Sequence, residues 1–344
     1  MRGREALIQS VLQEYGALTR QALRRYLPAL EPRRYLYDLV ADYPRRGGKM
    51  MRPSLCIATA RTFGARAEEA LRAAVSIELF HNSLLVHDDV HDESELRRGA
   101  PSLHVLHGVP LALNAGSTLA MLSMRPLTDY RLGFGFKVPL LLVEELVRMG
   151  RESAEGQALE LGWRRDNVVD LCDADYFEMV LKKTCWYTTI SPMRLGALIG
   201  CRDMLPEFDT LIRFGFFFGT AFQIRDDVLN LTGDERYGKE IYDDLLEGKR
   251  TLMVIHLLSQ ATPEERERVT AFLASPRAER VGEPVRWVVE RMKHYGSIDY
   301  AQEVANGLAG AALHEFSLLF DTLPDSRDKH FLADLVPWVL ERTS

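Results

Sequence analysis

An acidic segment at residues 87–98 contains the side chains whose types and spacing most clearly suggest chemistry. It contains five carboxylates and two guanidiniums within twelve residues. Asp88 and Asp92 are four residues apart, so they share one face if the helix that precedes them continues. Two carboxylates on one helix face suit a hard divalent cation such as Mg²⁺, which keeps several waters and shares its shell with substrate phosphates. The alternative is a solvated charged turn at a helix end.

A similar acidic pair, Asp226 and Asp227, follows another apolar run later in the chain. Side chains from opposing helices of a bundle can build metal sites, so two such helix ends could face each other. A diphosphate bound through these metals would also need cationic groups to contact it. The sequence offers candidates in Lys49, Arg52, Arg97, Arg98, Lys183, Lys239 and Lys249, with Thr184 and Gln223 as polar orienting groups.

Helical periodicity extends over nearly the whole chain and must position these residues. Apolar residues recur every three or four positions, and no run alternates with period two for long enough to indicate a sheet. Proline and glycine predict loops over residues 42–49 and 129–137. Since no linker-like or low-complexity segment divides the chain, we predict a single all-α domain over residues 1–344. Its helices are expected at residues 4–27, 52–63, 67–90, 139–161, 173–195, 207–231, 251–259, 263–273, 283–295, 298–320 and 326–342.

Composition limits the class of protein. The 344 residues are 47% apolar and 27% charged, which is ordinary for a soluble globular protein. The net charge of −6 argues against a general nucleic-acid binder. The four cysteines have no C-x-x-C spacing and are typical of reduced core residues in a cytosolic protein. No signal peptide and no membrane-spanning run is recognisable, so a cytoplasmic protein is expected.

An ordered series of motifs gives the sequence a family resemblance. From about residue 40 onward, the series resembles the trans-isoprenyl diphosphate synthases of the polyprenyl synthetase family, and geranylgeranyl diphosphate synthases in particular. The resemblance implies an antiparallel helical bundle around a deep central cavity, usually dimeric. It also implies head-to-tail condensation of isopentenyl diphosphate with an allylic diphosphate. The motifs are Gly47-Gly48-Lys49-x-x-Arg52-Pro53, His81, Asp88-Asp89-x-x-Asp92, Arg97-Arg98-Gly99, Gly156-Gln157, Lys183-Thr184, Phe222-Gln223-Ile224-x-Asp226-Asp227, Gly238-Lys239, Glu247-Gly248-Lys249-x-Thr251 and Gly296-Ser297-Ile298-x-Tyr300-Ala301.

The resemblance further implies a role for each matching residue. The positions that ligate three Mg²⁺ ions correspond to Asp88, Asp92 and Asp226, and those that support them to Asp89 and Asp227. The residues that bind the allylic diphosphate correspond to Arg97, Lys183 and Lys249, with Lys239 nearby. The isopentenyl diphosphate site corresponds to Lys49, Arg52, His81 and Arg98. The polar groups that stabilise the developing allylic cation correspond to Thr184 and Gln223.

These residue types suit the implied reaction. A diphosphate leaves an allylic carbon only if its growing negative charge is neutralised, which metal ions and cationic side chains do in a site that excludes water. Holding the isopentenyl double bond close to the cation supplies much of the remaining rate. No side chain is an obvious general base, and the resemblance implies that the departing pyrophosphate takes the proton.

Product length in the family depends on what blocks the tunnel below the first acidic motif. Ser83 and Leu84, five and four residues before Asp88, are not aromatic, so the tunnel is not plugged near its top as in farnesyl-type relatives. Phe80, one turn further down, is the next candidate floor. This pattern predicts geranylgeranyl diphosphate, with farnesyl or longer products as alternatives.

Three positions depart from the family pattern. Asn230 and Ser117 stand where many relatives have Asp, and Glu160 replaces a common Asp. None is a principal metal position, so activity is expected to survive, although Asn230 removes one possible ligand.

Two other functions use similar motifs. A terpene cyclase would carry an Asn/Ser/Glu metal triad, but residues 226–234 lack its terminal Glu. A cyclase would also have no need of Lys49 and Arg52. A non-catalytic synthase subunit typically loses aspartates, whereas five of the six Asp positions of the two motifs are retained here.

Overall fold

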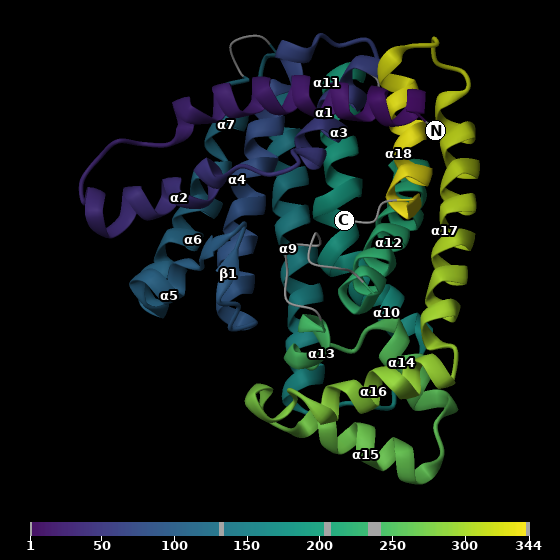
Figure 1. The fold of residues 1–344 in the computed structure, drawn as a ribbon. Helices are drawn as coiled ribbons and strands as arrows, with labels where there is room; N and C mark the ends of the chain where they lie inside the picture. Colours follow the sequence, from purple (N-terminus) through teal and green to yellow (C-terminus); the bar gives the residue numbers. More distant parts are fainter. Residues whose placement is uncertain (1, 131–133, 203–207, 233–241, 342–344) are drawn as a thin grey trace. The chain divides into compact units, whose positions relative to one another are not determined.

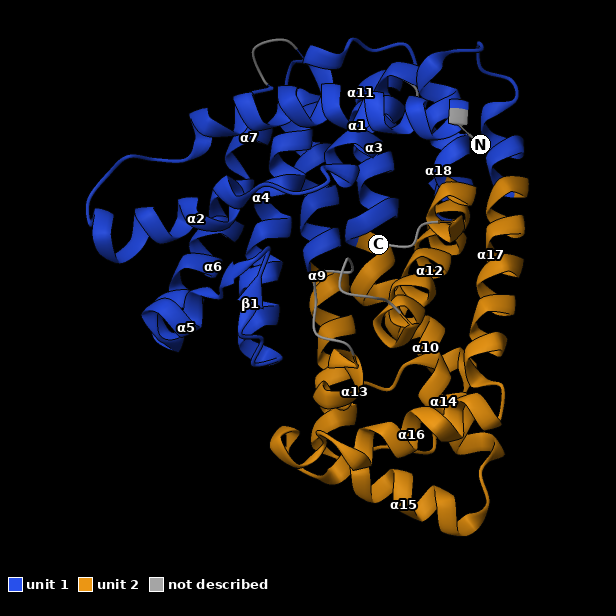
Figure 2. Ribbon diagram, in the orientation of Figure 1, with its two compact units in different colours: residues 1–150, 187–212, 315–335 blue, residues 151–186, 213–314, 336–344 orange. Residues whose placement is uncertain are grey.

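Helices dominate the computed structural model, which confirms the all-α prediction (Figure 1). The structure describes residues 2–130, 134–202, 208–232 and 242–341. None of the helices in these ranges is long and apolar enough to cross a membrane. The chain divides into two compact units, formed by residues 1–150, 187–212 and 315–335 and by residues 151–186, 213–314 and 336–344 (Figure 2). The single domain over residues 1–344 stays a prediction.

The first unit is organised around α4 (Ala67–His91), the helix that ends in the first acidic motif. The carboxylate of Glu69 accepts the backbone N–H of Arg66 at 2.7 Å and closes the first turn. Small, fully buried alanines, among them Ala70 and Ala74, let neighbouring helices approach α4 closely. Its neighbours in this unit are α1 (Arg2–Leu23), α2 (Asp38–Arg46), α3 (Met51–Thr62), α5 (Leu103–His107), α6 (Val109–Ser123), α7 (Arg125–Thr128) and α11 (Ser191–Cys201).

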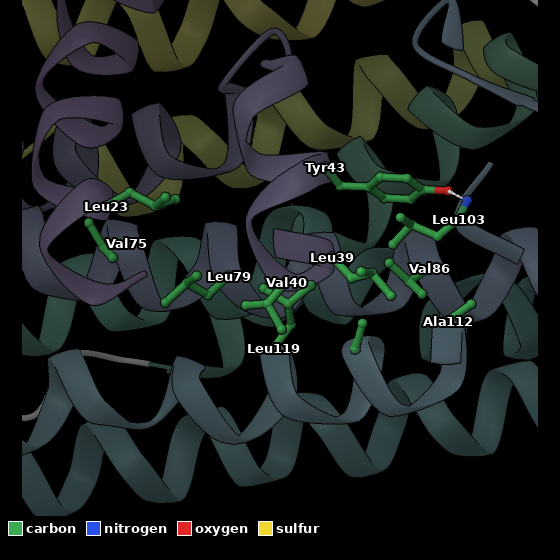
Figure 3. Packing of buried hydrophobic residues seen from close by; sticks show 11 residues of the cluster. Leu23, Leu39, Val40, Tyr43, Val75, Leu79, Val86, Leu103, Ala112 and Leu119 are labelled. Carbon is green, nitrogen blue, oxygen red and sulfur yellow. Dashed lines mark hydrogen bonds between the residues drawn. The ribbon is translucent and has the colours of Figure 1, made fainter. Parts of the chain in front are cut away.

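An apolar cluster fixes α2 and α6 against α4 (Figure 3). Tyr43 of α2 is completely buried in this cluster, together with Leu79 and Val86 of α4 and Leu119 of α6. The hydroxyl of Tyr43 accepts the backbone N–H of Leu103 at 3.1 Å. Tyr43 therefore joins the end of α2 to the start of α5 inside the core.

A short antiparallel hairpin follows the first acidic motif. β1 (Leu96–Arg97) pairs with β2 (Ala100–Pro101), and Arg97 lies opposite Ala100. The two turn residues between the strands, Arg98 and Gly99, have φ angles of 54° and 75°. Positive φ at both central positions is the requirement of a type I′ turn, whose twist matches that of the flanking strands.

The second unit is also helical and contains the second acidic motif near the end of α12. A π-helix, η3 (Leu181–Ile190), follows α10 directly, and its first six residues belong to this unit. The helices wholly or partly in this unit are α9 (Lys137–Arg165), α10 (Asp173–Val180), α12 (Phe208–Thr232), α13 (Asp243–Glu247), α14 (Leu252–Gln260), α15 (Pro263–Ala274), α16 (Glu283–His294), α17 (Ser297–Phe320) and α18 (Arg327–Glu341).

Several predicted boundaries were wrong, and the helical segment predicted over residues 173–195 continues to Cys201. The predicted loop over residues 42–49 begins too early, because α2 continues to Arg46 and contains Pro44. Apolar residues at positions 36, 39, 40 and 43 give this segment a buried helical face that outweighs the proline. The predicted first helix ends at Leu23 rather than Leu27, and a single 3₁₀ turn, Arg24–Tyr26, follows it.

Candidate active site

The first acidic motif has the helical geometry that its spacing predicted. Asp88 lies in the last turn of α4, and Asp92 caps the helix by donating its backbone N–H to the Asp88 carbonyl at 2.8 Å. Asp88 is half-buried, and Asp92 is 7% exposed. The two carboxylates therefore belong to consecutive turns of one helix end.

Asp89 points into the unit and binds an arginine. It is 1% exposed and accepts Arg97 Nε at 2.8 Å, and the same oxygen also accepts the Arg97 Nη2 group. Its other oxygen accepts the hydroxyl of Tyr43. Asp89 thus fixes the orientation of Arg97, whereas the supporting role expected for it toward the metal ligands stays a prediction.

Three of the four residues expected to bind isopentenyl diphosphate lie in the same part of the first unit. Arg52 contacts the imidazole of His81, with Nη1 and Nε2 3.4 Å apart, and donates Nη2 to Thr188 Oγ1 at 2.9 Å. Its guanidinium lies 4.5 Å from the ring centroid of Tyr187, which also stacks on His81. Lys49 is exposed in the segment just before α3.

The charge state of His81 follows from its surroundings. Burial, and then the nearby charges of Arg52 and Arg98, hold the pKa of His81 well below its usual range. A guanidinium only donates, so Nε2 facing Arg52 is an acceptor and the ring proton resides on Nδ1. That Nδ1 atom is buried and has no hydrogen-bond partner within the described ranges. The cluster therefore offers a neutral donor beside two permanent cations, which suits an anion.

Hydrogen bonds hold the guanidinium of Arg98 close to the backbone of Gly48. Its Nη1 donates to the Tyr43 carbonyl at 2.9 Å and to Asn82 Oδ1 at 3.3 Å. A Cβ on Gly48 would lie 2.8 Å from Arg98 Nη2, so a side chain at position 48 would displace the guanidinium. The two arginines of the hairpin are thus adjacent in sequence but bound by different partners.

A linked set of polar side chains surrounds the second acidic motif in the second unit. Thr184 donates to Gln223 Oε1 at 3.0 Å, and Gln223 Nε2 donates to Asp227 Oδ1 at 2.7 Å. The other oxygen of Asp227 accepts the hydroxyl of Tyr176 at 2.8 Å. The sequence predicted Thr184, Gln223 and Asp227 but not Tyr176. Asp227 is buried, while Asp226 beside it is half-buried.

Asp227 is an unusual carboxyl. Burial, followed by the negative charges of Asp244 and Asp226, raises the pKa of Asp227 to about 8 despite the hydrogen bonds from Gln223 and Tyr176. Ionisation of Asp227 is therefore opposed by burial and by the negative charges already present at this helix end. A bound cation would reduce this opposition.

Two of the predicted lysines pair with acids in the second unit. Lys183 Nζ lies 2.5 Å from Glu160, the position where the family commonly has Asp. Lys249 Nζ lies 3.1 Å from Asp244 and also contacts Glu247. A Cβ on Gly156 would lie 2.1 Å from the backbone nitrogen of Lys183, so only glycine lets α9 and η3 approach this closely. Lys239 lies outside the described residues.

Asn230, one of the departures from the family pattern, has a structural role. It is 1% exposed, and its side-chain oxygen accepts the backbone N–H of Asp244 at 3.1 Å. Its backbone carbonyl accepts the N–H of Tyr242 at 3.0 Å. Asn230 thus binds the first turn of α13, which precedes Lys249. Ser117, in contrast, is exposed on α6.

The proposed chain-length residues differ in exposure along α4. Phe80 and Leu84 are half-buried, whereas Ser83 is 2% exposed. A Cβ on Gly150 of α9 would lie 3.5 Å from the tip of the Phe80 ring, so the ring lies against bare backbone. The space near this phenylalanine thus depends on the absence of a side chain at position 150.

The donor set fits Mg²⁺ better than a transition metal. No group of three or more His, Cys, Asp or Glu side chains that could hold a metal by themselves occurs in the described ranges. Pairs of carboxylates that leave room for water and phosphate are the usual protein contribution to a Mg²⁺ site. His87 does not extend the set, because its ring packs on α6, where a Cβ on Gly116 would lie 2.9 Å from Nε2.

Sequence reasoning missed Tyr43, Tyr176, Asp244 and Glu160 as partners of the site. Tyr43 was missed because its segment was interpreted as a loop. The helical spacing of apolar residues over positions 36–43 could have indicated that Tyr43 is buried. Tyr176 and Glu160 reach their partners across 51 and 23 residues, distances at which no sequence periodicity operates.

Comparisons with known proteins identify the family of the chain. The family model described as polyprenyl synthetase matches residues 33–292. A short chain isoprenyl diphosphate synthase of Methanothermobacter thermautotrophicus is 32% identical over 337 residues, which cover 97% of this chain and 98% of the relative.

Solved structures are similar over the same length. The geranylgeranyl pyrophosphate synthetase of Pyrococcus horikoshii matches with a TM-score of 0.86 and 31% identity, covering 98% of this chain and 99% of that one. The geranylgeranyl pyrophosphate synthase of Corynebacterium glutamicum, complexed with isoprenyl diphosphate and magnesium, matches with a TM-score of 0.84 and 26% identity over 96% of this chain and 99% of that one. The chain therefore belongs to the polyprenyl synthetase family, as its ordered motifs predicted.

Proposed function

We propose that this protein is a Mg²⁺-dependent prenyltransferase that condenses isopentenyl diphosphate head-to-tail with an allylic diphosphate, with geranylgeranyl diphosphate as its main product. The observation that carries the proposal is the cluster of Arg52, His81 and Arg98 in the first unit. This cluster provides two cations and a neutral donor for an anion separate from the acidic motif. A terpene cyclase has no second substrate that would require it.

The proposed reaction assigns a separate role to each group of residues. Asp88, Asp92 and Asp226 would hold three Mg²⁺ ions, which neutralise charge on the departing diphosphate. Arg97, Lys183 and Lys249 would bind the allylic diphosphate, and each already has a carboxylate that orients it. Thr184 and Gln223 would present oxygen dipoles to the allylic cation.

Magnesium as the cofactor is supported by the oxygen-only donors of both motifs. Support also comes from the magnesium that accompanies isoprenyl diphosphate in the related Corynebacterium glutamicum structure. The raised pKa of Asp227 is consistent with a site that gains a cation on ligand binding.

Geranylgeranyl diphosphate is the product that Phe80 favours. The ring is half-buried on α4, and the helix above it carries no aromatic side chain at positions 83 and 84. The two solved relatives described above are geranylgeranyl pyrophosphate synthases, which is consistent with this product length.

A cytoplasmic homodimer is the form that we propose. Exposed apolar side chains lie along α6, with Val109 44% and Met121 69% exposed, and along α9, with Leu140 60% and Val147 54% exposed. A contiguous apolar surface formed by such side chains would suit a second subunit. Sedimentation velocity would test the dimer directly.

The activity is tested by incubating the purified protein with Mg²⁺, isopentenyl diphosphate and allylic primers of increasing length. We expect isopentenyl diphosphate to be consumed and C20 prenyl diphosphate to accumulate. No consumption with any primer would contradict the proposal and would favour a non-catalytic subunit. Cyclic products formed from an allylic diphosphate alone would favour a cyclase.

A further inference from the structure

The end of α2 contacts the hairpin that carries Arg97 and Arg98 through both side chains and backbone. Tyr43 is fully buried, and its hydroxyl donates to Asp89, the carboxylate that binds Arg97. The carbonyl of the same residue accepts Arg98 Nη1 at 2.9 Å. One residue is therefore connected to both arginines by different atoms.

Helix-end chemistry explains why the carbonyl is available. The last four carbonyls of a helix have no intrahelical partner, and α2 ends at Arg46. The negative end of the helix dipole also attracts cations such as Arg98. The carbonyl of Tyr43 is thus a ready acceptor at this position.

Arg46 holds the backbone of the hairpin. Its guanidinium donates to the carbonyls of Arg97 at 2.9 Å, Ala100 at 3.2 Å and Pro101 at 2.9 Å. It also stacks 4.7 Å from the ring centroid of Tyr43 and pairs with Asp42 at 2.6 Å. Three carbonyls from both strands are therefore bound to one side chain of α2.

We propose that Tyr43 and Arg46 are positioning residues that place Arg97 and Arg98 for the two diphosphates. Tyr43 acts on Arg97 through its hydroxyl and Asp89, and on Arg98 through its carbonyl. Arg46 fixes the hairpin as a whole. This inference rests on the proposed function, since that function assigns Arg97 to the allylic diphosphate and Arg98 to isopentenyl diphosphate.

A mutation can separate the effect of the Tyr43 hydroxyl from the effect of its carbonyl. Tyr43→Phe removes the hydroxyl but leaves the carbonyl and the ring. We expect the KM for the allylic diphosphate to rise about fivefold to tenfold, within the range for one typical lost hydrogen bond, while the KM for isopentenyl diphosphate changes by less than about twofold. Arg46→Met should raise both KM values, because it loosens the backbone that carries both arginines.

Matched controls separate positioning from general loss of stability. Tyr130→Phe also removes a buried hydroxyl that accepts a helix N–H, that of Ala73 at 3.1 Å, but this hydroxyl contacts the first turns of α4, where it donates to the Glu69 carbonyl, and not the hairpin. It should lower the melting temperature as Tyr43→Phe does and leave both KM values unchanged. Arg45→Met removes an exposed arginine beside Arg46 and should have no effect.

Hydrogen exchange tests the positioning without substrate. The backbone amides of residues 96–103 should exchange faster in Arg46→Met than in the wild-type protein. Unchanged exchange there, or equal rises in both KM values for Tyr43→Phe, would overturn the inference. A wild-type protein that consumes no isopentenyl diphosphate would instead contradict the proposed function, and the exchange result would still decide whether Arg46 fixes the hairpin.

Discussion

The hydroxyl of Tyr176 donates a hydrogen bond of 2.8 Å to the buried carboxyl of Asp227. Together with Gln223 it opposes the effect of burial, which raises the pKa of this carboxyl to about 8. The bond therefore favours the charged form of Asp227 beside the proposed metal ligand Asp226. The first prediction concerns this bond.

Tyr176→Phe removes one of the two side-chain donors to Asp227. The carboxyl then ionises less readily, and the charge that attracts Mg²⁺ decreases. We expect the Mg²⁺ concentration for half-maximal turnover to rise about threefold to tenfold, within the range for one typical lost hydrogen bond. A magnesium titration of the turnover rate checks this. An unchanged titration curve would show that Tyr176 serves packing alone.

Asp88→Ala should lower turnover by about three orders of magnitude or more, because it removes a proposed ligand of the ions that stabilise the leaving group. The fold should persist, since Asp88 is half-buried at the end of α4. Thermal unfolding and turnover are measured together. Glu95→Ala, which removes an exposed carboxylate from the same acidic segment, should leave both unchanged. A near-normal rate for Asp88→Ala would mean that other residues hold the metals.

Phe80→Ala should lengthen the product, because the ring is the proposed floor of the tunnel. Chromatography of the dephosphorylated products should show a shift from C20 to C25 and longer chains. Gly150→Leu should act in the opposite direction, since its side chain would meet the Phe80 ring, which already lies 3.5 Å from a Cβ at this position. Unchanged product length in Phe80→Ala would exclude Phe80 as the floor.

Asn230→Asp should destabilise the metal-free protein by about 1–3 kcal/mol, the cost of a poorly satisfied buried polar group. The new carboxylate would retain the bond to the Asp244 amide but add charge where Asp244 and Asp226 already raise the pKa of Asp227. Urea unfolding in EDTA measures this loss. Added Mg²⁺ and pyrophosphate should reduce this decrease in the free energy of unfolding. An equal decrease with and without metal would show that a bound metal does not affect the residue at position 230.

The neutral state of His81 predicts a pH dependence of stability. Its pKa is lowered in the folded protein, so its contribution to stability is fully present above about pH 6.5 and is lost as the pH falls toward the folded pKa. Over that range His81 should lower the free energy of unfolding by up to about 1.4 kcal/mol per pH unit. His81→Gln should show a shallower dependence, whereas the exposed His314→Gln should follow the wild type. Identical slopes for wild type and His81→Gln would contradict a neutral His81.

The sequence predicted α4 almost to the residue, because a long apolar face ending in Asp88 and Asp92 allows few other structures. Its motifs also included Gly48 and Gly156: a side chain at position 48 would displace the Arg98 guanidinium, and one at position 156 would clash with the backbone of Lys183. The partners Tyr43 and Tyr176 were not predictable in the same way. Each reaches an aspartate through a tertiary contact across 46 or 51 residues, and such a contact leaves no local pattern.

The hairpin of Arg97 and Arg98 has a further consequence. If these neighbours bind the two diphosphates as proposed, both substrates depend on the β1–β2 hairpin, which is bound to α2. A first substrate that orders this hairpin lowers the entropic cost of binding the second. Binding should therefore be cooperative, and linkage requires each substrate to increase the affinity for the other by the same factor.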